Sequence, residues 1–188
     1  MGDPHSPDRR PVGMVTAAAH RFGKSLGEHL AGAGIDVAIT SLALLSSRVK
    51  VIERAGGRAI ALRMNANDPV SVNLALQAVM AHFGSLDLLV HIAPHELRVK
   101  TPSGLDPCTE AVASMMQGRG GAVIYLLGAG DCFPEGPARA WTERGVRLVG
   151  VRVNPGESPH AVREAVVRAF RDSRAVAGSV QQVADLTR

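Results

Sequence analysis

The chain is poor in aromatic residues and in cysteine. Aromatic residues make up 3% of its 188 positions, with one tryptophan, Trp141, and one tyrosine, Tyr125. The two cysteines, Cys108 and Cys132, are far apart in the sequence and outside any C-x-x-C spacing. This pattern argues against a zinc knuckle or a disulfide framework, so we expect two reduced thiols, as is usual in a cytoplasmic protein.

Long hydrophobic runs and clustered basic residues are missing as well. No apolar run approaches the ~18 to 20 residues needed to cross a bilayer, and residues 1–10 lack the apolar centre of a signal peptide. We therefore expect a cytoplasmic protein with no membrane contact. The net charge is +4, but Arg9-Arg10 is the only adjacent pair of Lys or Arg residues. A nucleic-acid-binding protein needs a clustered basic face or stacking rings, so no nucleic-acid partner is expected.

What the sequence does contain is a regular alternation of short β-branched runs with helical patterns. The predicted strands are Val12–Thr16, Asp36–Thr40, Arg58–Leu62, Leu86–Ile92, Ala122–Leu127 and Val146–Val153. The predicted helices follow Phe22, span Ser46–Ala55, begin at Asp68-Pro69, Asp106-Pro107 and Ser158-Pro159, and lie around Ala138–Arg144. The alternation predicts right-handed βαβ units and therefore one α/β domain with a doubly wound parallel sheet. We expect this domain over residues 11–188, behind a flexible tail of residues 1–10.

Ligands of such sheets bind beyond the carboxyl ends of the strands. The first predicted strand leads into the turn Thr16–Gly23, where a dinucleotide-binding fold places glycines so that the pyrophosphate approaches the backbone. Only Gly23 remains of these glycines, while three alanines keep the turn small and Arg21 is placed to meet a phosphate. A tight strand-to-helix turn without a ligand accounts for this segment equally well.

Several segments, in chain order, carry a family resemblance. They are residues 11–40, Glu53–Arg63 followed by Asp68-Pro69, His82–Val90, Gly145–Gly156 and Gly178–Asp185. These segments resemble the short-chain dehydrogenase/reductase family. Ala18–Gly23 (AAHRFG) is most similar to the pteridine reductase branch, where an arginine stands in the place of the middle glycine. The resemblance implies a Rossmann-like fold, a nicotinamide coenzyme and a small-molecule ligand.

The resemblance also implies which residues contact the coenzyme. They are Ala17, His20, Arg21, Phe22, Gly23, Ser41, Asn65, Ala66, His91 and Ala93. No acidic residue closes the second predicted strand, and His20 and Arg21 are basic. This balance favours a 2′-phosphate over a free 2′-hydroxyl group, so the predicted coenzyme is NADP(H).

The catalytic residues of that family have no counterpart here. The family's fifth strand ends in a substrate-binding serine, whereas this chain has Leu127 and Gly128. In the family's Tyr-x-x-x-Lys pair the lysine lowers the tyrosine pKa, but Tyr125 is the only tyrosine and Ala129 lies four residues after it. The chain is also shorter than the family pattern after the fourth and fifth strands. We therefore predict a catalytically degenerate homologue, a non-catalytic partner or regulatory subunit that forms a homo- or hetero-oligomer with a subunit of this family.

Two other interpretations stay open. An active NADPH-dependent oxidoreductase of pteridine reductase type requires a non-standard proton donor, for which His91 and Asp131 are the candidates. Alternatively, polar residues near the strand ends form a zinc site or an acid/base set; these are His20, His91, His95, Glu96, Asp131 and Cys132. Because loops at strand ends are polar in any case, no metal site is predicted.

Overall fold

The chain forms one sheet of seven parallel strands. The computed structural model describes residues 9–20, 22–43, 45–92, 105–128, 131–154, 156–175 and 184–185. The strands are β1 (Val12–Val15), β2 (Asp36–Ser41), β3 (Ala59–Arg63), β4 (Leu88–Ile92), β5 (Gly121–Leu127), β6 (Val146–Arg152) and β7 (Ala184–Asp185). Their order is β3-β2-β1-β4-β5-β6-β7, and every neighbouring pair is parallel. This order confirms the predicted doubly wound α/β sheet.

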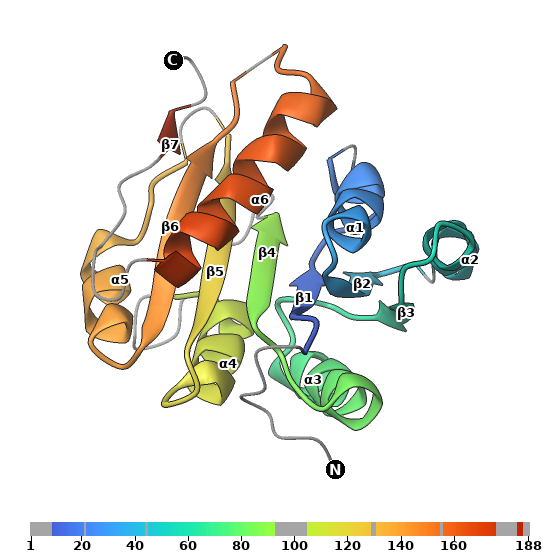
Figure 1. Ribbon diagram of the computed structural model, residues 1–188. Helices are drawn as coiled ribbons and strands as arrows, with labels where there is room; N and C mark the ends of the chain where they lie inside the picture. The colour runs from blue at the N-terminus through green and yellow to red at the C-terminus, as the bar shows by residue number, and fades with distance from the viewer. Residues whose placement is uncertain are drawn as a thin grey trace.

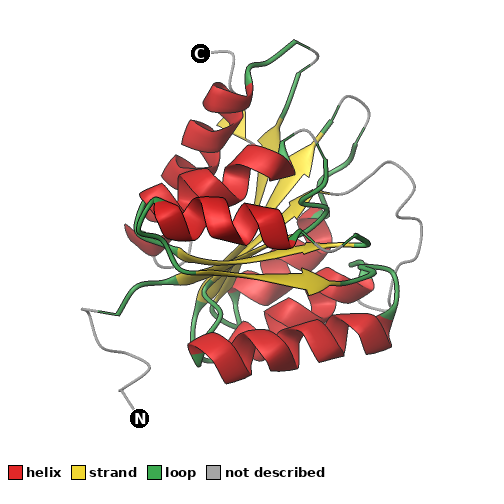
Figure 2. Cartoon of the chain, turned by 90° about the vertical axis from the view of Figure 1, so that its right-hand side faces the viewer, coloured by secondary structure: helices red, strands yellow, loops and turns green. Residues whose placement is uncertain are grey.

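Helices cover both faces of the sheet, as Figures 1 and 2 show. The helices are α1 (Gly23–Gly32), α2 (Ser46–Arg54), α3 (Pro69–Phe83), α4 (Pro107–Met116), α5 (Glu135–Thr142) and α6 (Pro159–Ala175). Helices α1, α2 and α6 bury apolar side chains against one face, where Val90 lies. Helices α3, α4 and α5 do the same on the opposite face, where Leu89 and Tyr125 lie. Since successive strand residues point to opposite faces, the strand alternation decides which side chains meet α4.

The Asp-Pro pairs begin helices as predicted. Asp68 accepts a hydrogen bond from the Val70 backbone N–H at 3.0 Å, and Asp106 accepts one from the Thr109 backbone N–H at 2.9 Å. A proline in the first helical turn costs no hydrogen bond, because the N–H groups of that turn have no partner within the helix. Gly84 ends α3 in the left-handed region, at φ 80°.

One predicted helix lies between β5 and β6 as expected but begins three residues earlier. We expected it around Ala138–Arg144, but α5 spans Glu135–Thr142. The prediction started the helix after Pro137, whereas this proline lies inside the first turn, where its missing N–H is not needed. Between β5 and β6 the described residues form only this eight-residue helix, in agreement with the predicted shortening.

Two arginines that the sequence placed in the tail are attached to the sheet. Arg9 holds the Asp87 carboxylate with two hydrogen bonds of 2.9 and 2.6 Å, and Arg10 forms an ion pair with Asp36 at 3.2 Å. Residues 1–8 of the predicted tail and residues 178–183 of the predicted last strand lie outside the described residues. Within the described part of the chain, no helix combines the length and the hydropathy of a membrane span.

Candidate functional site

The turn between β1 and α1 has the geometry of a glycine-rich turn, although it holds alanines. Ala17 adopts a left-handed conformation at φ 46°, which costs an alanine roughly 1–2 kcal/mol. A Cβ atom on Gly23 would lie 2.7 Å from the Cα of Ala18, so only glycine fits where the turn enters α1. Among the described residues, no side chain forms a cap hydrogen bond at Phe22, the N-cap position of α1. Backbone N–H groups in the first turn of an α-helix have no partner within the helix, and anions bind at such positions in many proteins.

Three more of the residues implied as coenzyme contacts lie at the ends of β2 and β3, along the same edge of the sheet. Ser41 is the buried last residue of β2, and the exposed Asn65 follows β3 beside the half-buried Ala66. The Asn65 side chain accepts a hydrogen bond from the Asn67 backbone N–H at 3.1 Å, which shapes the turn before α3. Two further residues of the predicted set, Arg21 and Ala93, lie outside the described residues.

A basic side chain that the sequence did not single out lies near this turn. Arg48, on α2, lines a shallow hollow together with Ala18 and Gly23. Its guanidinium forms an ion pair with Glu28 at 3.0 Å. The exposed His20 lies in the turn itself. His20 and Arg48 thus lie near the start of α1, and Arg48 is paired there with the acidic Glu28.

A separate polar cluster lies inside the protein, on the face that α4 covers. His91 of β4 is paired in register with Tyr125 of β5, and their rings meet edge to face with centroids 5.6 Å apart. Thr16 follows β1 next to them, and its Oγ1 lies 3.1 Å from His91 Nδ1. The same Oγ1 accepts the backbone N–H of Ile92 at 3.0 Å. Three neighbouring strands therefore bring Thr16, His91 and Tyr125 together by register alone.

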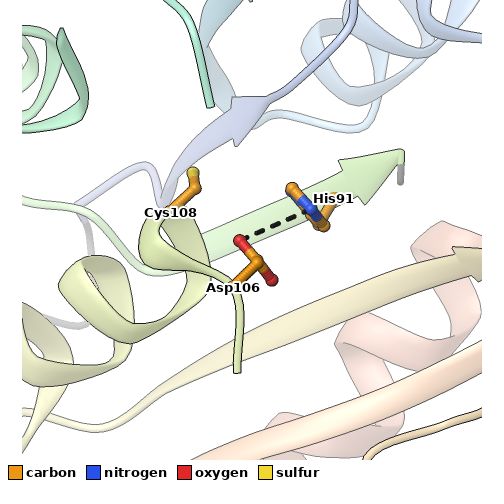
Figure 3. Close-up of side chains that lie close together, drawn as sticks. All are labelled: His91, Asp106 and Cys108. Carbon is orange, nitrogen blue, oxygen red and sulfur yellow. Dashed lines mark ion pairs between the residues drawn. The ribbon is translucent and has the colours of Figure 1, made fainter. Parts of the chain in front are cut away.

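The first turn of α4 completes this cluster, as Figure 3 shows. Asp106 Oδ1 faces His91 Nε2 at 3.6 Å, and Asp106 Oδ2 accepts a hydrogen bond from the Tyr125 hydroxyl at 3.3 Å. Cys108 is the second residue of α4, and its thiol is buried. The His91 nitrogen, an Asp106 oxygen and the Cys108 sulfur all lie within 4.8 Å of one another.

Burial controls the protonation of this cluster. Complete burial lowers the pKa of His91, so its imidazole is neutral at neutral pH, against the pull of Asp106. Burial also opposes ionisation of Asp106, but the pKa of Asp106 still lies below its ordinary value, because hydrogen bonds from Thr109 and, when the imidazole is protonated, the charge of His91 favour the carboxylate. Burial and the Asp106 charge raise the pKa of both Cys108 and Tyr125. The resting cluster is therefore a carboxylate surrounded by neutral groups.

Among its described residues, the structure does not bring the predicted acid/base and metal candidates together: Asp131 and Cys132 lie after the end of β5, whereas His91 lies in the buried cluster. Asp131 is bound at the end of β5, where its carboxylate accepts the Gly128 backbone N–H at 2.7 Å, whereas His91 contacts Thr16, Asp106 and Tyr125. Cys132 is exposed beside Asp131. Two other candidates, His95 and Glu96, lie outside the described residues.

Sequence reasoning missed Asp106 and Cys108 as partners of His91. Asp106 was assigned only as a helix cap, and Cys108 only as an unremarkable thiol. The strand register brings Thr16, His91 and Tyr125 to one face once the order β1-β4-β5 is known. Asp106 and Cys108 join them only because α4 packs on that face.

The chain was compared with known proteins. A family model described as short chain dehydrogenase matches residues 11–117, more than half of the chain. The 3-oxoacyl-[acyl-carrier-protein] reductase FabG of Escherichia coli (strain K12) is 29% identical over 82 residues, 44% of this chain and 33% of that protein. The matched segment thus spans about a third of the length of this relative.

Solved structures of low sequence identity share the fold. A short-chain dehydrogenase/reductase from Sinorhizobium meliloti 1021 superposes with a TM-score of 0.75 at 24% identity, over 95% of this chain and 97% of that one. A 3-ketoacyl-(acyl-carrier-protein) reductase from Brucella melitensis, complexed with NADH, gives 0.70 at 16% identity, over 93% and 97%. A metagenomic short-chain oxidoreductase in complex with NADP gives 0.71 at 17% identity, over 93% and 98%. By the family match and by its fold, this chain belongs to the short-chain dehydrogenase family.

Proposed function

We propose that this chain is a non-catalytic member of its family, a partner or regulatory subunit that does not reduce carbonyl groups. The observation that carries the proposal is the state of Tyr125, the only tyrosine. Its side chain is 6% exposed, and its hydroxyl donates to the buried Asp106 carboxylate. Tyr125 therefore has a structural role within the core.

The electrostatics of Tyr125 are opposite to those of a proton donor in carbonyl reduction. A catalytic tyrosine works with a neighbouring lysine that lowers its pKa. Burial and the nearby carboxylate instead raise the pKa of Tyr125. The position of the family's serine is occupied by Leu127 and Gly128, so the carbonyl of a substrate would lack that hydrogen-bond donor too.

Two other candidates for a proton donor are poorly placed. His91 is 1% exposed and points toward α4, away from the edge where a substrate would enter. The Asp131 carboxylate is bound to the Gly128 backbone N–H. An active reductase of pteridine reductase type is therefore the weaker candidate, and the AAHRFG segment is the feature that favours it.

The β1–α1 turn supports a retained coenzyme site. Three features support a pyrophosphate site on backbone N–H groups: the left-handed Ala17, the sterically required Gly23 and the start of α1, where no side chain of a described residue forms a cap hydrogen bond. Ser41 in place of an acidic residue, with the exposed His20 and with Arg48 close to the turn, favours NADP(H) over NAD(H). In this proposal the bound coenzyme stabilises the subunit, and the chain supplies no proton to a substrate.

The partner role is supported by an apolar surface on α3. Val70 and Leu74 are 67% and 62% exposed, and residues four apart lie on the same side of a helix. In the proposed oligomer, this side of α3 contacts a second subunit of the same family.

One experiment with two readouts tests the proposal. NADPH binding is measured by isothermal titration calorimetry, and NADPH oxidation is followed with a panel of pterins and carbonyl compounds. We expect saturable binding, tighter for NADPH than for NADH, and no oxidation that depends on the carbonyl compound. Robust reduction by the purified chain alone would refute the non-catalytic assignment.

Two glycine variants identify the binding site. Gly23→Ala places a methyl group against the backbone of Ala18 and should abolish NADPH binding. Gly32→Ala lies in the same helix where a Cβ atom meets no other atom within 4 Å, and it should leave binding unchanged. Equal binding by both variants would show that the β1–α1 turn does not hold the coenzyme.

A further inference from the structure

The buried cluster on the α4 side of the sheet has no role in the proposed function. It joins an imidazole, a carboxylate and a thiol from two elements of the fold, as Figure 3 shows. We propose that His91, Asp106 and Cys108 bind one zinc ion. This site lies between the sheet and the start of α4, and it is distinct from the β1–α1 turn where the coenzyme is proposed to bind.

The distances suit a tetrahedral ion. Zinc binds imidazole nitrogen and carboxylate oxygen at about 2.0–2.2 Å and thiolate sulfur at about 2.3 Å, so ligand atoms of one ion lie about 3.3–3.8 Å apart. His91 Nε2 and Asp106 Oδ1 are 3.6 Å apart. All three ligand atoms lie within 4.8 Å of one another, so in this proposal the Cys108 side chain moves closer to the ion when zinc binds.

An unpartnered polar atom points into this space. His91 Nε2 is fully buried and has no hydrogen-bond partner among the described residues. Leaving a buried polar group unpaired costs about 1–3 kcal/mol. Asp106 Oδ1, which faces this nitrogen at 3.6 Å, lies beyond hydrogen-bonding distance. A cation between the two atoms gives His91 Nε2 the partner that it lacks.

Two of the ligands are already oriented by neighbouring groups, as is usual around protein-bound metals. Asp106 is fixed by the Thr109 backbone N–H at 2.9 Å and by the Tyr125 hydroxyl at 3.3 Å. His91 Nδ1 lies 3.1 Å from Thr16 Oγ1. With an ion on Nε2, the imidazole proton resides on Nδ1 and is donated to Thr16 Oγ1, whose second lone pair accepts the Ile92 N–H.

Charge and softness both favour zinc. When the ion binds, the sulfur–zinc bond forms as the thiol proton of Cys108 leaves to solvent, so the site holds one thiolate, one carboxylate and one neutral imidazole. These two negative charges balance a divalent cation, which is required in an interior that excludes isolated charge. A thiolate with an imidazole selects zinc over magnesium or calcium. Three protein ligands leave the fourth position for a water molecule.

The untagged protein is stripped with a chelator and then titrated with zinc against a chromophoric competitor. We expect one equivalent to bind. Cobalt(II) titrated into the same protein should give the visible bands of a four-coordinate ion and a near-ultraviolet band from sulfur to cobalt. This spectrum needs no variant, so it does not depend on a mutant's ability to fold. Absence of stoichiometric binding, or a cobalt spectrum without the sulfur band, would overturn the proposal.

The two cysteines provide a matched pair of variants. Cys108→Ser should remove the sulfur-to-cobalt band, whereas Cys132→Ser, at the exposed cysteine, should retain it. Thr16→Val, which removes the partner of His91 Nδ1, should weaken zinc binding about 10- to 100-fold. Retention of the band in Cys108→Ser, or its loss in Cys132→Ser, would place the ion elsewhere. None of these readouts depends on the coenzyme, so the zinc site and the proposed function can fail separately.

Discussion

Replacement of Tyr125 by phenylalanine separates a structural tyrosine from a catalytic one. The change Tyr125→Phe removes the hydroxyl that donates to Asp106 Oδ2 at 3.3 Å and keeps the ring contacts with His91 and Phe133. It also leaves Asp106 its hydrogen bond from the Thr109 backbone N–H. The substitution therefore isolates one hydrogen bond to a buried carboxylate.

The expected loss of stability follows from the geometry of this bond. A hydrogen bond to a charged group contributes about 1.5–3 kcal/mol. Its length exceeds the usual ~2.8 Å for an O–H donor, so the lower end applies, about 1.5 kcal/mol. For a domain of this size such a loss corresponds to a fall in Tm of about 3–6 °C.

A double-mutant cycle with Asp106→Asn measures the bond itself. Asparagine is also a good helix cap, so the start of α4 is preserved while the charge is removed. Urea unfolding of the unmodified protein, the two single variants and the double variant should give a coupling free energy of about 1 kcal/mol. A coupling near zero, together with loss of a measurable NADPH-dependent activity in Tyr125→Phe, would refute the structural role.

Three further predictions concern stability. In the presence of a chelator, the free energy of unfolding should fall as the pH drops from about 6.5, because His91 has a lowered pKa in the folded protein and is protonated first in the unfolded state. His91→Asn should reduce this pH dependence, which is measured by urea unfolding at each pH. Asp87→Ala removes the acceptor of the Val12 N–H and the partner of Arg9 and should cost about 1–2 kcal/mol in the same assay. Leu89→Ala, at a fully buried position, should cost about 2–5 kcal/mol in thermal or urea unfolding.

Much of the fold could be predicted because its signals are local. The Asp68-Pro69 and Asp106-Pro107 pairs begin helices through hydrogen bonds that span two or three residues. The apolar runs of β4 and β5 need only burial on both faces to be identified as parallel strands. The start of α5 was missed because Pro137 is tolerated in a first turn but resembles a helix boundary in the sequence.

The buried cluster could not be predicted from local signals. Tyr125 meets His91 through the register of β4 with β5, which depends on the strand order. Asp106 was expected to cap α4 and does so with Oδ1, yet its other oxygen accepts from Tyr125. One residue thus serves a local and a long-range role, and only the local one is visible in the sequence. The predicted coenzyme contacts at Ser41 and along the β1–α1 turn stay predictions.

The most direct test of the non-catalytic assignment uses the single tyrosine. Absorbance at the phenolate band reports Tyr125 alone, since it is the only tyrosine in the chain. In the folded protein we predict no phenolate at pH 10, the ordinary pKa of a tyrosine, because burial and Asp106 raise the pKa of Tyr125 above it. In denaturant the same group should titrate near pH 10. Phenolate formation in the folded protein below pH 10 would contradict the structural role of Tyr125 and make it a candidate for a proton donor.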